Sequence, residues 1–395
     1  MSMNFSILKE LKIPEGNVAK ITDASDKVLW EAASAMAGNV FGVCWDTSNS
    51  STALTRLTPD TDPYRYVTQT VTEEPKPAVG TGAGSSPFDA FMPWSGMQEC
   101  NLNTAGTVTA WKGDNRFSRD GDFVMVYIPE FYVSYKESGT KKYFYISDVQ
   151  NRGFTKHPGS GKYVGKYHMN SNGRSTTYAS PWVKVTRADA RSKAMGIGSK
   201  FYLYDFATYC AIIWLYVVEF ADWDSQSRIG QGAVMLSAAI SSGGTDSMTY
   251  HTGRAAGVNG KTAVQYRGVE NLWGNVFLLA DGFNANGTTA YYCTDPSKYA
   301  DDTETGYTKI GTLPSSGWIK DLTVTRDGLL IPKAVGGSET TYIPDYIYSS
   351  SSGWRTLRVS NWYGSDTTGG LLHFGVATAS SGTAKHMTAR VMCEA

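Results

Sequence analysis

Apolar and polar residues alternate near the end of the chain. Leu357 and Val359, and then Leu372, Phe374 and Val376, follow a spacing of two. Because successive side chains of a strand point to opposite faces, this spacing predicts the buried rows of two strands. The residues between and around these rows share no chemistry and fit no catalytic spacing, so they are predicted to form an exposed recognition surface. They are Asn361, Trp362, Tyr363, Ser365, Asp366, Thr367, His373, Gly375, Ala377, Lys385 and His386.

Two segments have the pattern of a helix. Thr186, with Asp189 three residues later, resembles a capping box and predicts a helix to about Met195. Gly196 is expected to end it in the left-handed conformation that glycine tolerates. Asp205 is predicted to cap a second helix, whose apolar residues at spacings of three and four form one stripe. That stripe comprises Phe206, Tyr209, Cys210, Ile213, Val217 and Phe220.

The rest of the pattern indicates strands and turns. The apolar runs 123–128 and 143–146, separated by a polar segment, predict a β-hairpin. Segment 266–277 is rich in Gly, Asn and Trp and predicts a fixed buried turn, in which Glu270 and Asn271 satisfy buried backbone groups. Glu219 and segment 226–230 are predicted to anchor the loop after the second helix. The fold class expected is α+β, with two helices packed on short strands.

A chain of 395 residues is too long for one small core and predicts several domains. Residues 1–36 contain turn signals and a short alternating strand around Val18 to Thr22, and they are predicted to dock on another protein or on oligomer mates. A partly flexible arm is the alternative. Residues 37–120 are expected to be mainly β, and residues 121–395 to form the α+β domain, with the recognition surface at 354–395.

Charge and composition narrow the possible partners. The chain has 36 basic and 36 acidic residues, so no net field favours nucleic acid or an anionic membrane surface. The longest apolar run, 210–218, is too short to span a bilayer, and the first residues lack the pattern of a secretory signal. The scattered cysteines predict reduced thiols formed in a cytosol. They are Cys44, Cys100, Cys210, Cys293 and Cys393.

The sequence contains no catalytic or metal-binding motif. Its five histidines lack the spacing of zinc ligands, and the Gly-rich stretch 79–87 lacks the Lys-Ser/Thr of a phosphate-binding loop. No cysteine or serine stands in a recognisable nucleophile context. We therefore expect no enzymatic activity, no cofactor and no metal.

Several motifs resemble a known family. The segment 270–276, Glu-Asn-Leu-Trp-Gly-Asn-Val, followed by Asp281 and Gly282, resembles the signature of the C-type-lectin-like domain of formylglycine-generating enzymes and their relatives. The segments 353–359 and 389–391 resemble late strands of that domain. Five more motifs occur in the same order in bacteriophage and prophage tail proteins that end in this domain, so the resemblance covers about residues 5–395. These motifs lie at 41–46, 54–57, 88–95, 124–132 and 226–232.

The resemblance implies a fold and a function. In such tail proteins the C-terminal lectin-like domain is the receptor-binding tip of a fibre, and many are trimeric. It implies a homotrimeric virion protein, made in the cytoplasm of the bacterial host, that binds a bacterial surface protein or glycan and joins other tail proteins through residues 1–36. Some relatives are targets of diversity-generating retroelements, which rewrite codons of the final segment. Ten residues of the recognition surface, all but Trp362, match the positions that would vary.

Departures from the family pattern leave alternatives open. Formylglycine-generating enzymes use a cysteine pair near the C-terminus, where this chain offers only Cys393. Phe277 and Leu278 replace the Trp-Glu that usually follows Gly-Asn-Val, so the oxidase chemistry is not expected even with a shared fold. The alternatives are an undiversified fibre tip, a structural tail or baseplate component, and a tail-associated enzyme.

Overall fold

Strands make up most of the regular structure of this chain. The computed structural model describes residues 20–22, 28–31, 36–121, 123–365 and 368–395. The described helices are few, so the fold is mostly β rather than an even α+β mixture. They are α1 (Arg187–Met195), α2 (Phe206–Phe220), α3 (Ser225–Arg228) and the 3₁₀ helices η2 (Pro87–Ala90), η3 (Trp94–Gly96) and η4 (Pro296–Lys298).

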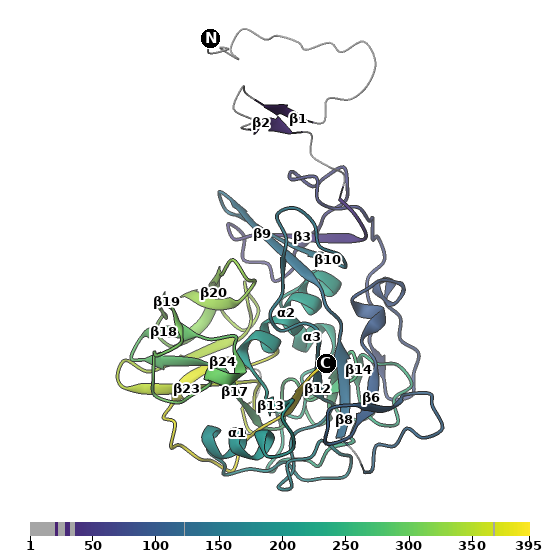
Figure 1. Cartoon of the computed structure of the whole chain (residues 1–395), viewed down its shortest axis with the longest axis vertical. Coiled ribbons are helices and arrows are strands. Elements are labelled where there is room, and N and C mark those ends of the chain that lie inside the picture. Colours follow the sequence, from purple (N-terminus) through teal and green to yellow (C-terminus); the bar gives the residue numbers. More distant parts are fainter. Residues whose placement is uncertain (1–19, 23–27, 32–35, 122, 366–367) are drawn as a thin grey trace.

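The largest sheet has nine strands. It includes the two strands that carry the alternating apolar residues between Leu357 and Val376. Its order is β19 (Thr308–Thr312), β18 (Thr289–Tyr292), β17 (Phe277–Asn286), β23 (Trp354–Val359), β24 (Phe374–Thr378), β22 (Tyr346–Ser349), β20 (Gly317–Val324) and β21 (Leu330–Val335), with β25 (Met387–Thr388) paired to β17. Most neighbours are antiparallel, but β22 runs parallel to β24 and β25 runs parallel to β17. Figure 1 shows this sheet on the left of the molecule.

Smaller sheets make up the rest of the described structure. The six-stranded sheet is β13 (Phe201–Leu203), β26 (Val391–Glu394), β12 (Lys162–Gly165), β8 (Phe123–Ile128), β6 (Glu99–Leu102) and β7 (Val108–Trp111). The five-stranded sheet is β11 (Thr155–Lys156), β9 (Tyr132–Ser138), β10 (Lys141–Ser147), β3 (Val40–Asp46) and β4 (Thr55–Arg56). The four-stranded sheet is β16 (Val269–Glu270), β15 (Val264–Tyr266), β14 (Gly253–Arg254) and β5 (Ala78–Val79), and β1 (Lys20–Thr22) pairs with β2 (Val28–Glu31).

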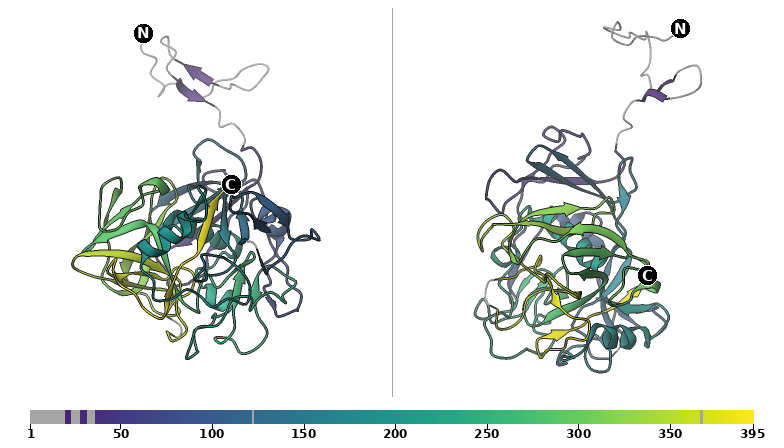
Figure 2. Two further views of the ribbon diagram at one scale, coloured as in Figure 1. Left: turned by 60° about the horizontal axis from the view of Figure 1, so that its bottom comes forward. Right: turned by 90° about the vertical axis from the view of Figure 1, so that its left-hand side faces the viewer.

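Helix α2 lies at the centre of the main core. All of its residues are buried, because it packs against β3 and β10 of one sheet and against β17 of another (Figures 1 and 2). A helix that is apolar all round is typical of such a central position. The single apolar stripe predicted for this helix is therefore wrong, although Asp205 does cap it by accepting a hydrogen bond from the Thr208 N–H at 2.7 Å.

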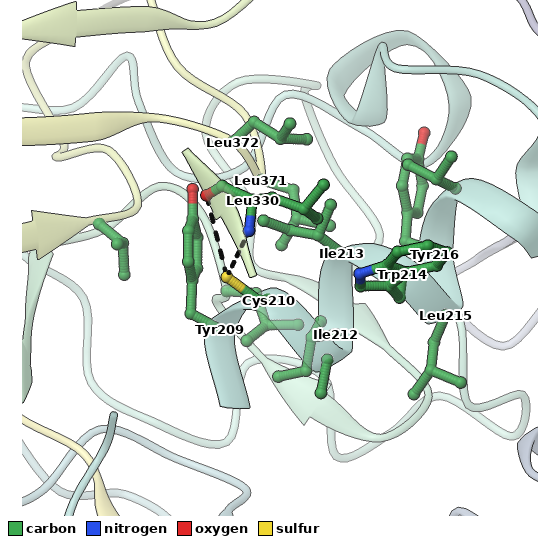
Figure 3. Close-up of a cluster of buried hydrophobic side chains, with 14 of the residues drawn as sticks. Tyr209, Cys210, Ile212, Ile213, Trp214, Leu215, Tyr216, Leu330, Leu371 and Leu372 are labelled. Atoms are coloured by element: carbon green, nitrogen blue, oxygen red, sulfur yellow. Dashed lines mark hydrogen bonds between the residues drawn. The ribbon is translucent and has the colours of Figure 1, made fainter. Parts of the chain in front are cut away.

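The same core holds the segment before β24 in place. Figure 3 shows Leu330, Leu371 and Leu372 in the cluster of side chains around α2, and the Leu330 N–H donates to Cys210 Sγ at 3.3 Å. Leu371 and Leu372 are 1% and 3% exposed. The C-terminal part of the chain is thus anchored on the most buried helix.

Two other local predictions have mixed outcomes. Helix α1 begins after Thr186, whose hydroxyl accepts from the Asp189 N–H, as predicted. The helix ends at Met195 with Gly196 as its cap, as predicted, but Gly196 has a φ of −69° and is right-handed rather than left-handed. The predicted hairpin of 123–128 with 143–146 is wrong. Strand β8 pairs with β6 and β12, whereas β10 pairs with β9 and β3, because Pro129 follows β8 and the chain then forms the unpredicted strand β9.

The core continues across the predicted domain boundary at residue 120. One buried cluster contains Phe41 and Trp94 from the first part of the chain together with Trp214 and Met392 from the second. Strands β3, β6 and β7 also share sheets with later strands. Within 1–36 the structure describes only β1 and β2, which include part of the predicted strand; Val18 and the predicted turns lie outside the described residues. Docking through this segment stays a prediction.

The predicted buried turn is confirmed. Glu270 is 1% exposed and accepts hydrogen bonds from Gly243 N–H at 3.0 Å and from the Thr245 N–H at 2.8 Å. The indole of Trp273 donates to the Gly230 carbonyl at 2.8 Å. Asn271 adopts a left-handed φ of 50°, which asparagine tolerates better than most residues. The turn is therefore architectural.

Glu219 is a buried polar anchor, but it contacts the buried turn and the start of η2 rather than the predicted loop after α2. Its carboxylate accepts from the hydroxyl groups of Ser86 at 2.7 Å and Tyr266 at 2.8 Å, and it pairs with the Arg267 guanidinium at 2.5 Å. Asp89 pairs with the same guanidinium at 2.7 Å. The contacts join α2, η2 and the buried turn through one charged network.

Candidate functional site

The apolar frame at the end of the chain lies where the sequence predicts it. Strands β23 and β24 are antiparallel, and Leu357, Val359, Phe374 and Val376 are at most 1% exposed within the main core. Leu372 is also buried, although it precedes β24. Because side chains alternate along a strand, the residues between these positions lie on the opposite face of the sheet.

That opposite face collects aromatic and cationic side chains, and we name it the C-terminal face. The register places Tyr348, Gly375 and Arg358 in one row across β22, β24 and β23. Beside this row, the rings of Trp318 and Tyr346 lie 5.5 Å apart, and Tyr346 lies 4.6 Å from Tyr348. The C-terminal face comprises Phe277, Trp318, Tyr346, Tyr348, Arg358, His373, Gly375 and Ala377, with Trp362 and His386 at one edge.

The ring of Phe277 lies at the centre of this cluster. Its centroid is 5.3 Å from the ring of His373 and 5.7 Å from that of His386. The Arg358 guanidinium lies over the same ring at 4.3 Å. The Trp362 ring packs on His386 at 4.5 Å, so the half-buried tryptophan joins the cluster through this imidazole.

Arg358 is partly buried and lacks an ordinary partner. Its Nε is buried without a hydrogen bond, and among the described residues it forms no ion pair. Gly375 makes room for its stem, since a Cβ there would lie 2.7 Å from Arg358 Cγ and 2.8 Å from Nε. Burial lowers the pKa of Arg358 from its usual value, with Tyr348 acting weakly in the opposite direction.

His373 is fully buried, and neither of its ring nitrogens makes a hydrogen bond. Burial and, to a smaller extent, the charge of Arg358 lower the pKa of His373 to about 3, and the backbone of Thr368 offsets this only in part. The ring is therefore neutral at physiological pH. A buried polar group left without a partner costs about 1–3 kcal/mol.

His386, at the edge of the face, is also surrounded by cations. Its Nδ1 is buried without a hydrogen bond. Burial lowers the pKa of His386, and the charges of Arg358 and Lys385 lower it further. The charged groups that lower the pKa values of His373 and His386 are cations, so this face favours a partner that supplies hydrogen-bond acceptors or negative charge.

The eleven residues of the predicted recognition surface differ in exposure. Ala377 and Lys385 are exposed, and Trp362, Ser365 and His386 are partly exposed. The expected exposure is wrong for four buried residues, and Asp366 and Thr367 lie outside the described residues. The buried four are Asn361, Tyr363, His373 and Gly375. Ligand binding by the eleven residues stays a prediction.

The loop between β23 and β24 folds inward, which explains this burial. The Asn361 side-chain amide donates to the Gly369 carbonyl at 3.0 Å, and the Tyr363 N–H donates to the Asn275 carbonyl at 2.9 Å. The buried Asp345 carboxylate accepts from Leu372 N–H at 2.7 Å and also from the Gly370 N–H. Both arms of the loop are thus fixed by backbone hydrogen bonds.

Sequence reasoning missed half of the C-terminal face. Phe277, Trp318, Tyr346, Tyr348 and Arg358 come from strands whose neighbours in the sheet were not predicted. One signal was present, because Tyr346 and Tyr348 flank the buried Ile347, and Arg358 lies between Leu357 and Val359, each at a spacing of two. Alternation gives the face of each side chain, but only the strand order brings them together.

Features outside the C-terminal face also bear on candidate chemistry. A cavity of about 700 Å³ lies against α1, and its lining includes Arg174, Trp182 and Lys193 but none of the eleven predicted residues. The described part of the chain has no group of three or more His, Cys, Asp or Glu side chains placed to hold a metal ion. All five cysteines are free and buried. Within the described ranges no helix has both the length and the apolar character needed to cross a bilayer.

Comparisons with known proteins add little. No protein-family model matches the chain, and no curated protein matches its sequence. Among solved structures it is similar to the "Major Tropism Determinant U1 Variant", with 10% identity over 91% of this chain and 73% of that chain, at a TM-score of 0.29. A likeness at that TM-score supports no conclusion about the fold or function of this chain.

Proposed function

We propose that this chain is a non-enzymatic receptor-binding protein of a phage or prophage tail. Its C-terminal part, in this proposal, is a C-type-lectin-like domain that binds a bacterial surface ligand through the C-terminal face. The observation that supports it is the division of β23 and β24 into a buried apolar side and a side with aromatic and cationic groups. The family motifs at 41–46, 88–95 and 226–232 support the tail context.

The physical character of the face suits recognition. Trp318, Tyr346, Tyr348 and Trp362 are partly exposed and stand on or beside paired strands. Large aromatic side chains with polar tips supply contact area at a low cost in conformational entropy, and such residues dominate the energetics of many interfaces. The frame beneath them packs on α2, so substitutions on the surface need not disturb the fold.

Assembly would strengthen weak contacts. As a homotrimer attached to other tail proteins through residues 1–36, the chain would present several copies of the face on one virion. The second and third contacts would then form at a high effective concentration, which raises the overall affinity without any new interaction. Diversification of the ten matching positions, where it occurs, would change the ligand of the same frame.

Substitution of exposed residues tests the proposal. Trp362→Ala and Lys385→Ala should each weaken adsorption of the purified chain to a panel of bacterial cells by about tenfold or more, as expected for anchor residues. Trp111→Ala and Lys309→Ala are matched controls, since Trp111 is 37% exposed on β7 and Lys309 is exposed on β19, away from this face. Both controls should adsorb like the parent chain.

Equal adsorption of the parent chain and the face variants would contradict the proposal. If the parent chain adsorbs to cells and both face variants adsorb equally well, the C-terminal face is not the receptor-binding surface. Alanine at Tyr363 or His373 is a poorer test, because these side chains are 5% and 0% exposed and their loss would also change stability.

A further inference from the structure

Arg358 differs from the other buried arginines of the chain. Arg187 and Arg267 pair with buried or partly buried carboxylates, and Arg390 donates to the carbonyls of Gly165, Lys166, Glu270 and Asn271. Arg358 has neither kind of partner among the described residues. Since a desolvated cation is normally compensated by an acceptor, this guanidinium has capacity for one that comes from outside the chain.

Packing against Gly375 and Phe277 positions the Arg358 guanidinium. The Arg358 stem lies across Gly375, where no side chain intervenes, and its head rests 4.3 Å above the centre of the Phe277 ring. Nε is buried, but the two terminal nitrogens are neither hydrogen-bonded nor fully shielded from solvent. The two terminal nitrogens therefore keep donors for an acceptor from outside the chain, while the stem packs over Gly375.

The groups around Arg358 also favour a partner that supplies acceptors or negative charge. His373, with both ring nitrogens unpaired, is fully buried against Phe277 and lies 5.6 Å from the Tyr348 ring. Tyr348 is in register with Gly375, and Lys385 is exposed beside His386. The face thus combines one planar cation, the exposed ammonium of Lys385 and the partly exposed rings of Tyr348 and Trp362.

We propose that Arg358 binds the carboxylate of an acidic saccharide on the bacterial surface, a sugar of the uronic or sialic acid type. This inference rests on the proposed receptor-binding function and names the class of its ligand. A single guanidinium matches a single carboxylate through two parallel N–H···O bonds, whereas phosphate sites more often gather several charges. The partly exposed ring of Tyr348, in the same row as Arg358, offers a surface for the apolar face of the sugar.

Binding of defined saccharides to the full chain tests this inference. The probes are oligosaccharides of glucuronic acid, of galacturonic acid and of N-acetylneuraminic acid, each compared with its carboxyl-reduced, neutral form. We expect at least one acidic probe to bind, carboxyl reduction to weaken it at least tenfold, and added salt to weaken it as well. Absence of binding by all three acidic probes, or equal binding of acidic and neutral forms, overturns the inference.

Variants locate the contact. Arg358→Gln should reduce binding of the acidic probe at least tenfold, and Arg358→Lys should restore it only in part, because an ammonium lacks the planar fork. Arg355→Gln is the matched control, since Arg355 lies on the same strand and donates to the Trp354 carbonyl. If Arg358→Gln binds as well as the parent chain, the assignment of Arg358 is wrong. The comparison of acidic and neutral probes on the parent chain needs no variant, so a folding defect does not leave the inference untested.

Two more measurements separate this inference from the proposed function. An oligo-glutamate peptide that binds through Arg358 while every saccharide fails would replace the glycan with a protein carboxylate and overturn the inference. Adsorption to cells that depends on Trp362 but survives both Arg358→Gln and carboxyl reduction of the cell-surface glycans would preserve the receptor function and overturn only the acidic ligand. Lack of adsorption to any cell in the panel would contradict the proposed function itself.

Discussion

The buried turn at 266–277 and the C-terminal face both place charged and polar groups in the interior. The two regions differ in whether those groups have hydrogen-bond or ion-pair partners. In the turn, Arg267 pairs with Glu219 and Asp89, and Glu270 accepts hydrogen bonds from two backbone N–H groups. On the face, Arg358 and His373 keep nitrogens without partners. A satisfied network holds a structure in one state, whereas an unsatisfied donor that reaches solvent stays available to a ligand.

The largest expected effect comes from breaking the satisfied network. Glu219→Gln removes one charge from a pair whose side chains are 2% and 1% exposed, and it leaves the Arg267 cation with only Asp89. We expect the free energy of unfolding to fall by about 3–5 kcal/mol, the usual cost of breaking a buried pair. Denaturant unfolding measures it. The exposed pair of Lys156 with Glu130 is the control, since Glu130→Gln should cost less than about 1 kcal/mol.

An effect of comparable size, spread over several pH units, should appear as a pH dependence of the face. The folded-state pKa of His373 is about 3, below the usual value of 6.5, so the unfolded chain binds the proton first as the pH falls. Stability linked to His373 is therefore complete above pH 6.5 and is lost progressively toward pH 3, at up to about 1.4 kcal/mol per pH unit.

His373→Phe isolates that contribution. It removes the titrating ring and the unpaired nitrogens, so the free energy of unfolding should fall less steeply with acid than in the parent chain. The buried His157 and His168, whose pKa values are also lowered by burial, remain in both proteins and cancel in the comparison. Parallel stability curves between pH 6.5 and 3.5 would show that His373 is not held neutral in the fold.

The smallest pair of effects compares two positions on one face of β24. Gly375→Ala places a Cβ against the stem of Arg358, and we expect a loss of about 1–3 kcal/mol together with weaker binding of acidic saccharides. Ala377→Ser, at an exposed position two residues later, should change the free energy of unfolding by no more than about 0.5 kcal/mol. Thermal unfolding of both variants measures the contrast. Equal effects at both positions would contradict the packing of Arg358 over Gly375.

Local patterns predicted local features well. The period of two identified which residues of β23 and β24 face the core, and the cap residues Thr186 and Asp205 marked the starts of α1 and α2. Each of these features depends on neighbours in sequence and on backbone geometry that repeats every two or every 3.6 residues. The buried turn was predicted from another local signal, the Gly, Asn and Trp residues within 266–277.

The features that depend on pairing between distant strands could not be predicted from the sequence. The hairpin prediction joined β8 to β10 because it took the nearest apolar runs as partners, whereas β8 pairs with β12 and β6. Likewise, the burial of His373 depends on Phe277, almost a hundred residues earlier, and on a loop that folds inward. No periodic pattern in one sequence encodes which distant strands become neighbours, so the composition of the face could not be derived.

Strand β26 has a consequence for how the chain is made. It lies between β12 and β13 inside the six-stranded sheet and follows His386, the last of the eleven predicted residues. The sheet can therefore close only after residues 391–394 have left the ribosome, so this part of the chain must fold late in translation. A premature stop or a frameshift before residue 391 would deprive the sheet of an interior strand.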